Sequence, residues 1–145
     1  MNFPDRIERT LELTHAPEKV WQALTTAEGL RGWFGSKADI DLRPGGEAHI
    51  EWEEHDARAT LWINVVEPPK RFAYSWGIEG LPEDDPRRTQ VEFTLEPTGS
   101  GTRLTLVESG FGQLPDELRT TAYNGNVQGW TEELDELVEY LDAAA

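Results

Sequence analysis

The chain has 145 residues, with 28 acidic side chains, 13 basic ones, no cysteine and a formal net charge of -15. This length suits a single domain, residues 1–145, that buries one hydrophobic core. The absence of cysteine excludes disulfides, thiolate metal sites and cysteine nucleophiles, and the excess of acids argues against binding to nucleic acid or to an anionic membrane.

The beginning of the sequence, 1–6, lacks the basic start and the apolar stretch of a signal peptide. No apolar run approaches the ~20 residues that a membrane-spanning helix needs. We therefore expect a cytoplasmic protein without membrane attachment, kept in solution by its acidic surface. An acidic face for a basic protein partner is the alternative interpretation of the same charge.

The first part of the chain predicts a strand followed by two short helices. Apolar and polar residues alternate imperfectly over 6–14, which predicts a strand. Pro17 favours the first turn of a helix, whose apolar stripe continues to Leu24. A second short helix should end at Trp33-Phe34-Gly35, where glycine interrupts the helical pattern.

The middle of the chain predicts consecutive strands joined by short turns. Alternating apolar residues place them over 48–52, 59–66, 72–76, 91–95 and 104–108. The strand over 59–66 is apolar on both faces, so we expect it to be covered on both sides. The segment 80–88 is rich in proline and acids and should be an exposed loop.

The last part of the chain predicts a helix of about five turns, because apolar residues follow helical spacing over 123–141. Gly125 and Gly129 weaken its first half by ~1 kcal/mol each relative to alanine. Either these small residues let a ligand approach the backbone closely, or the helix begins with a frayed or kinked turn. Strands joined by short turns imply an antiparallel meander, so the fold class is α+β.

Six motifs lie in order along nearly the whole sequence, at Pro17–Thr25, Trp33-Phe34, Pro44–Gly46, Val66–Trp76, Thr102–Phe111 and Gly129–Leu141. Together they resemble the motifs of the helix-grip (START-like) proteins of the SRPBCC superfamily. The subgroup that they resemble most is named for its likeness to the C-terminal domain of the activator of the heat-shock-protein-90 ATPase.

This resemblance implies a curved antiparallel sheet of about six or seven strands that wraps a long C-terminal helix, with two short helices after the first strand. It also implies a cavity between the sheet and that helix. One departure stands out, because Glu108 occupies the position where the family often has a histidine. A role proposed for that histidine therefore cannot be transferred to this chain.

Aromatic side chains are the main signal for a ligand site, since six tryptophans are many for a chain of this size. Aromatic walls suit flat or apolar ligands, although the same rings could simply fill a core. The expected cavity residues are Trp33, Phe34, Trp52, Trp62, Asn64, Tyr74, Trp76, Phe93, Leu106, Glu108, Phe111, Tyr123, Val127, Trp130 and Leu134.

Glu108 is the sharpest polar candidate, because its strand parity matches that of Leu104 and Leu106 and predicts an inward side chain. It could anchor a ligand amine or hydroxyl, or act as a general base. The alternative is a residue at the strand end that reaches solvent or pairs with Arg31. Asn64 interrupts an apolar run and either points into the cavity or is satisfied within the sheet.

The sequence contains no motif that predicts a metal or cofactor site. His15, His49 and His55 lack the spacing of metal ligands, and we expect no metal site. Neither a G-x-S-x-G nucleophile motif nor a phosphate-binding glycine loop occurs. We therefore expect no bound cofactor.

The leading hypothesis is a binding domain for a small apolar or aromatic molecule. The second is a protein-interaction module, as the likeness to a chaperone-ATPase activator suggests. The third is a cyclase- or hydrolase-like enzyme in which Glu108 is the acid/base group, assisted by Asn64 or Tyr123; it ranks below binding because no convergent catalytic set is present. The protein should be a monomer, or a homodimer through an exposed aromatic patch near Trp33-Phe34.

Overall fold

The computed structural model describes residues 5–78, 81–82 and 85–143. Within these residues the chain forms one seven-stranded sheet, three α-helices and two short 3-10 helices. In chain order they are β1 (Arg6–Leu13), α1 (Pro17–Thr25), α2 (Ala27–Trp33), β2 (Lys37–Ile40), β3 (Glu47–Trp52), η1 (Glu53–His55), β4 (Ala57–Glu67), β5 (Arg71–Gly77), β6 (Arg88–Thr98), β7 (Gly101–Ser109), η2 (Phe111–Gln113) and α3 (Asp116–Ala143).

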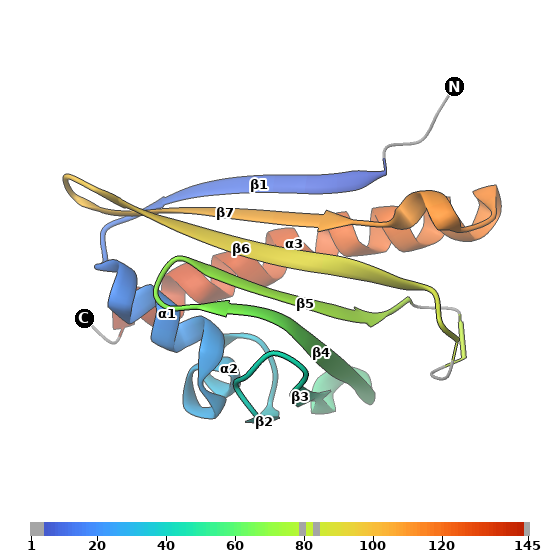
Figure 1. Ribbon diagram of the computed structural model, residues 1–145, viewed down its shortest axis with the longest axis horizontal. Helices are drawn as coiled ribbons and strands as arrows, with labels where there is room; N and C mark the ends of the chain where they lie inside the picture. The colour runs from blue at the N-terminus through green and yellow to red at the C-terminus, as the bar shows by residue number, and fades with distance from the viewer. Residues whose placement is uncertain (1–4, 79–80, 83–84, 144–145) are drawn as a thin grey trace.

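The sheet is antiparallel throughout, with strand order β1-β7-β6-β5-β4-β3-β2. Strands β3 to β7 form the predicted meander, β2 extends it at one edge, and β1 adds to the opposite edge beside β7. Because β1 and β2 lie at opposite edges, α1 and α2 carry the chain from one edge of the sheet to the other (Figure 1). The α+β helix-grip fold expected from the sequence is confirmed, and the segment expected to be a loop, 80–88, lies partly outside the described residues.

One face of the sheet is packed and the other is polar, as alternation along the strands requires. The packed face lies against α3, which runs behind the sheet in Figure 1. The large apolar side chains buried on this face come from six of the strands and include Ile7, Ile50, Leu61, Ile63, Phe72, Tyr74, Val91, Phe93, Leu104 and Leu106. The core therefore sits between the sheet and the helices.

The strand β4 is covered on one face, which corrects the expectation that both of its faces are covered. Trp62 points to the outer, polar face, where the Arg88 guanidinium lies 3.4 Å from the centre of its ring. Asn64 is exposed, at a β-bulge between Ile63 and Val65, and donates to the Ser75 hydroxyl at 2.9 Å. Neither side chain points toward α3, because both share the outward parity of the strand.

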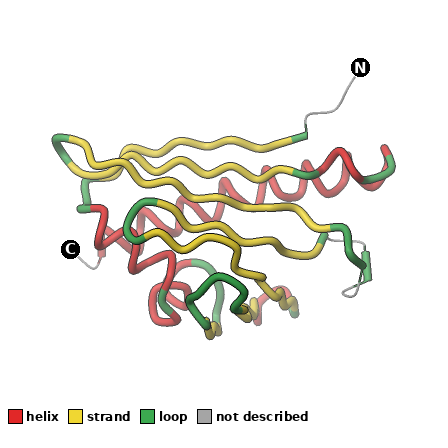
Figure 2. The backbone as a smooth tube through the Cα atoms, viewed as in Figure 1, coloured by secondary structure: helices red, strands yellow, loops and turns green. Residues whose placement is uncertain are grey.

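The short helices α1 and α2 pack tightly against each other. The helix α1 begins at Pro17, whose fixed φ suits the first helical turn, and α2 is capped by Thr26, which accepts from the Gly29 amide at 2.9 Å. The Trp33 indole donates to the Ala23 carbonyl at 2.7 Å and ties the two helices together. Figure 2 shows both helices in red below one end of α3.

This packing corrects a second expectation. Trp33 and Phe34 are 4% and 3% exposed, so they form no surface patch. The prediction of an exposed aromatic patch at Trp33-Phe34, on which the homodimer alternative depended, is therefore wrong.

The helix α3 buries Ala122, Trp130, Leu134, Leu137 and Leu141 on one stripe. Its C-terminal end is held by two residues that precede or begin α1. Lys19 donates to the Leu141 carbonyl at 3.2 Å, and the His15 ring lies 2.8 Å from the Asp142 carboxylate. A cation beside the last carbonyls of a helix is favourable, because the helix dipole is negative at that end.

Two glycines offer a matched test of helix packing. A Cβ at Gly129 of α3 would meet nothing within 4 Å, whereas a Cβ at Gly29 of α2 would lie 2.5 Å from the Gln22 carbonyl oxygen. Gly129→Ala should raise the free energy of unfolding by about 1 kcal/mol, through helix propensity alone. Gly29→Ala should lower it by more than about 1 kcal/mol, since backbone must shift. Urea denaturation measures both, and a loss of stability in Gly129→Ala would contradict the open space seen there.

Candidate functional site

The carboxylate of Glu108 lies at the centre of a hydrogen-bonded cage in the protein interior. The residue is 0% exposed and points from β7 toward α3, as its strand parity predicted. The indole nitrogens of Trp76 and Trp130 donate to it, each at 2.8 Å, and the Thr89 hydroxyl donates at 2.5 Å. The Asn126 amide donates to both oxygens, at 3.0 and 2.9 Å.

This cage assembles side chains from three strands and one helix. Val91 of β6 pairs with Glu108 across the sheet, and Trp76 of β5 pairs with Thr89. Asn126 and Trp130 are one helical turn apart on α3 and therefore reach the same point of the sheet. A buried carboxylate needs such donors, because removing it from water without them costs several kcal/mol.

An aromatic cluster adjoins the cage. The ring centres of Trp76 and Trp130 are 5.6 Å apart, and Phe34 stacks on both, at 6.1 and 5.9 Å. Phe93 meets Trp130 edge-on at 5.9 Å, and Tyr74 meets Trp76 edge-on at 5.5 Å. Glu108 thus lies at the edge of a set of aromatic faces.

Little free space remains inside this cluster. The cavity beneath α2 has a volume of about 10 Å³, which is room for about one water molecule. It is lined by Leu24, Leu30, Trp33, Phe34, Leu61, Phe72, Tyr74 and Phe93. A ligand can enter here only if a side chain moves out.

The expected cavity residues occupy three places in the structure. The cage and its aromatic cluster contain Phe34, Tyr74, Trp76, Phe93, Glu108 and Trp130. The same hydrophobic core also contains Trp33, Trp52, Leu106, Val127 and Leu134. Trp52 also donates from its indole to the Phe34 carbonyl. Phe111 and Tyr123 form a separate pair, 5.3 Å apart, and the Tyr123 hydroxyl donates to the Arg6 carbonyl. Trp62 and Asn64 lie on the outer face, as described above.

Sequence reasoning missed two of the groups that bind Glu108. Thr89 has the inward parity of Val91 and Phe93, so the strand pattern could have identified it. Asn126 lies four residues before Trp130, which places it on the buried stripe of the helix. Arg31, the partner considered for Glu108, instead donates to the Ala38 carbonyl at 3.4 Å.

A second acidic side chain, Glu133, faces the core from α3. Its Oε2 atom is buried and has no hydrogen-bond partner among the described residues. Burial, and to a lesser extent the nearby carboxylates of Glu136, Glu132 and Glu54, raise the pKa of the Glu133 carboxyl from 4.5 to about 8. Burial also raises the pKa of the Tyr74 hydroxyl well above 10, with added contributions from the Glu108 and Glu133 carboxylates.

Stability should therefore depend on pH through Glu133. The folded state binds this proton more tightly than the unfolded chain, so the contribution is complete below about pH 4.5 and is lost as pH rises through about 8. Glu133→Gln should match the wild type near pH 4.5 and exceed it by about 1 kcal/mol near pH 9, a value reduced because the half-buried group stays partly screened by water. Denaturation at both pH values tests this, with exposed Glu139→Gln as the control; a difference that does not change with pH would contradict it.

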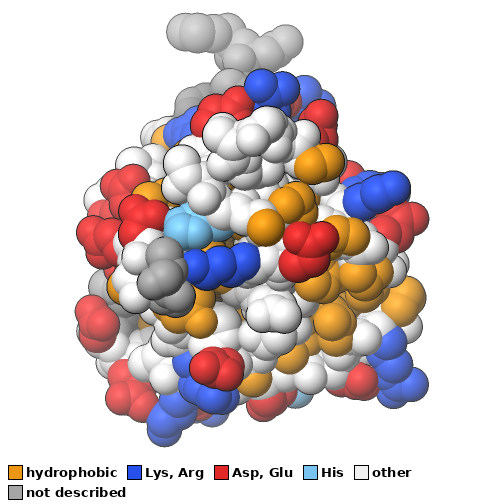
Figure 3. Space-filling view, turned by 90° about the vertical axis from the view of Figure 1, so that its left-hand side faces the viewer, with side chains coloured by type: hydrophobic (Ala, Val, Ile, Leu, Met, Phe, Trp, Pro, Cys, Tyr) orange, Lys and Arg blue, Asp and Glu red, His pale blue; other side chains and the backbone are white. Residues whose placement is uncertain are grey.

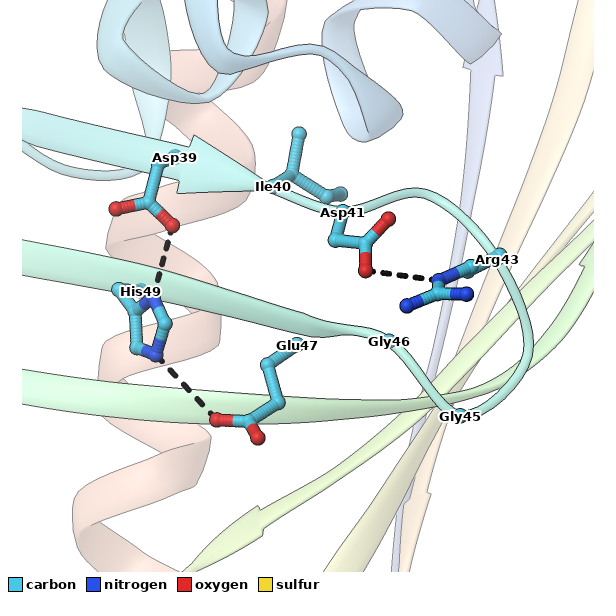
Figure 4. A pocket seen from close by; sticks show the side chains of 8 residues that line it. All are labelled: Asp39, Ile40, Asp41, Arg43, Gly45, Gly46, Glu47 and His49. Atoms are coloured by element: carbon cyan, nitrogen blue, oxygen red, sulfur yellow. Dashed lines mark hydrogen bonds and ion pairs between the residues drawn. The ribbon is translucent and has the colours of Figure 1, made fainter.

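A hollow on the surface lies elsewhere, at the hairpin of β2 and β3 (Figure 4). It has a volume of about 400 Å³, and its charged side chains already pair with one another. His49 lies 2.8 Å from Asp39 and 3.4 Å from Glu47, and Arg43 donates to Asp41 at 2.8 Å. The hydrogen bond with Asp39 raises the pKa of the His49 ring. Exposed pairs of this kind contribute little, and no group of three potential metal ligands occurs in the described residues.

At one end of the molecule the charged side chains are spread over the surface rather than gathered in one patch. Figure 3, which views the left-hand end of Figure 1, shows acidic and basic side chains interspersed, with hydrophobic ones between them. Among the described residues, no helix has the length and apolarity needed to cross a membrane.

Comparison with known proteins identifies the family. The model of the "Activator of Hsp90 ATPase homolog 1-like protein" family matches residues 14–142. No curated protein matches the sequence. Among solved structures, protein MLL2253 from Mesorhizobium loti is 31% identical, with a TM-score of 0.82 and coverage of 97% of this chain and 98% of that one.

Two further solved structures are similar over most of the chain. Protein NE0264 from Nitrosomonas europaea is 25% identical, with a TM-score of 0.78 and coverage of 97% and 96% of the two chains. CalU16 from Micromonospora echinospora is 27% identical, with a TM-score of 0.66 and coverage of 94% of this chain and 74% of its own. With the fold and the match over residues 14–142 in agreement, the chain belongs to the family of activator of Hsp90 ATPase homolog 1-like proteins.

Proposed function

We propose that the protein binds a small apolar or aromatic molecule between the sheet and α3, in the place that the Phe34 ring now occupies. The observation that carries this proposal is the fully buried Glu108 carboxylate, held by four side chains beside a cluster of stacked rings. A well-packed apolar side chain would serve stability as well or better than a buried charge. The carboxylate is therefore best explained as a fixed polar contact for a ligand.

Phe34 is the side chain whose movement would make room. It lies at the C-terminal end of the seven-residue helix α2 and is followed by Gly35. Its ring stacks on Trp76 and Trp130, so a planar ligand in its place would meet the same two faces. Binding thus exchanges one aromatic ring for another.

The geometry favours binding over acid/base catalysis by Glu108. Both carboxylate oxygens already accept hydrogen bonds, and the residue is closed to solvent. A general base must reach the proton that it abstracts. Glu108 serves better as an anchor for a ligand than as a base that exchanges protons with water.

The test is a titration of the intrinsic tryptophan fluorescence with a panel of small aromatic and apolar compounds. Trp130→Phe alters the cluster, whereas Trp62→Phe removes an indole from the outer face of the sheet. We expect saturable quenching in the wild type and in Trp62→Phe, and at least about tenfold weaker binding in Trp130→Phe, which also lacks one bond to Glu108. No saturable response to any compound, in a protein shown to be folded by circular dichroism, would refute the proposal.

A further inference from the structure

The cage around Glu108 consists of neutral groups. The indoles of Trp76 and Trp130 and the amide of Asn126 use N–H groups, which can donate but not accept. Such donors match a carboxylate that carries its negative charge. Among the described residues, no lysine, arginine or histidine forms an ion pair with Glu108, so its charge has no counter-charge in direct contact.

A positively charged group on a ligand would supply the missing counter-charge for Glu108. Opposite charges attract far more strongly in a dry interior than in water, and a hydrogen bond to a charged group is worth more than one between neutral groups. Both oxygens of the Glu108 carboxylate already accept hydrogen bonds, but no positive group in contact with it balances its negative charge among the described residues. The missing contribution is therefore a positive group and not merely another donor.

Asn126 marks where that group would bind. Its amide nitrogen alone lies within 3.0 Å of both oxygens of Glu108, the position from which an ammonium group would contact both. The side chain is half-buried, and it stands on the part of α3 next to exposed Gly125. Beyond it, a Cβ on Gly129 would meet open space. Of the four donors, Asn126 is thus the one that can turn away without disturbing the sheet.

The surroundings also favour a cation. The rings of Trp76 and Trp130, whose centres lie 5.6 Å apart, stay beside the ligand when Phe34 moves out, and cations bind favourably to aromatic faces, to indole most of all. The net charge of -15 raises the concentration of cations near the protein. Both effects act in the same direction as the carboxylate.

We propose that the ligand of this site is a flat aromatic or apolar molecule bearing a protonated amine, whose ammonium group replaces the Asn126 amide on Glu108. This inference rests on the proposed function, since it names the chemical class of the ligand for the same site. It predicts discrimination by charge between molecules of the same shape.

The experiment compares 2-naphthylmethylamine with 2-naphthylmethanol, which has the same ring and a donor group but no charge. Calorimetric titration of the wild type should show the amine binding at least about tenfold more tightly than the alcohol. Glu108→Gln should abolish this ratio. Asn126→Ala should bind the amine more tightly than the wild type does, because the carboxylate no longer has to release its amide donor.

The outcomes separate the two proposals. If the alcohol binds saturably and as tightly as the amine, the pocket exists and the inference about charge is overturned. The same holds if the preference for the amine persists in Glu108→Gln, or, should that variant not fold, if Asn126→Ala leaves amine binding unchanged. If neither compound binds to the folded wild type or to Phe34→Ala, the proposed function fails and the inference fails with it.

Discussion

Replacement of Glu108 by leucine should lower the free energy of unfolding by about 3 kcal/mol or more, although it exchanges a buried charge for an apolar side chain. The reason is the cage, because Trp130, Thr89 and Trp76 would each keep a donor without an acceptor. Each buried donor left unsatisfied costs about 1–3 kcal/mol. Thermal and urea denaturation measure the loss.

A matched variant separates the cage from acid removal in general. Glu92 lies on the adjoining strand β6, on the outer face, and pairs with Arg71 at 2.9 Å. Glu92→Leu should change stability by less than about 1 kcal/mol, because exposed ion pairs contribute little. If Glu108→Leu were as stable as the wild type, the hydrogen bonds of the cage would make no net contribution to the free energy of unfolding.

Phe34→Ala should cost about 3–5 kcal/mol and create a site for small aromatic molecules. Phe34 is 3% exposed and packs on Trp76 and Trp130, so its removal leaves a cavity bounded by those rings. A dry apolar cavity of this kind binds aromatic solutes. Added indole should therefore raise the melting temperature of Phe34→Ala, because a ligand that binds the folded state stabilises it.

Leu114→Ala provides the control for this rescue. Leu114 is 4% exposed and follows η2, a different element from those that form the aromatic cluster. Its truncation should cost about 2–5 kcal/mol, yet indole should leave its melting temperature unchanged. Equal rescue of both variants, or of neither, would show that the space behind Phe34 is not a specific aromatic site.

Much of the fold follows from periodicity in the sequence. Phe72, Tyr74 and Trp76 alternate with smaller residues, which indicates a strand. Trp130, Leu134 and Leu137 follow helical spacing, which indicates a helix. The edge strand β2 was not predicted, because its four residues, Lys37–Ile40, are too few to show a clear alternation of apolar and polar residues. Its strand pairing with β3 is a tertiary effect.

The candidate site was predictable only in outline. The inward direction of Glu108 follows from its parity with Leu106, since alternation is a local property. The four donors reach Glu108 only because β5, β6 and α3 pack together, and this tertiary arrangement cannot be predicted from a local sequence pattern. The tight filling of the cluster by Phe34 depends on side-chain rotamers and on the packing of α2, so the small size of the cavity could not be deduced.

The clamp at the C-terminal end of α3 has a consequence for how the protein opens. Lys19, His15 and three buried leucines anchor the second half of this helix, whereas its first half buries Ala122 fully and contains two glycines. Local opening free energies follow such differences in burial. Amide hydrogen exchange should therefore be fast up to about Gly129 and slow beyond Leu134. The half of α3 that carries Asn126 can then detach from the sheet while the rest of the helix keeps the core closed.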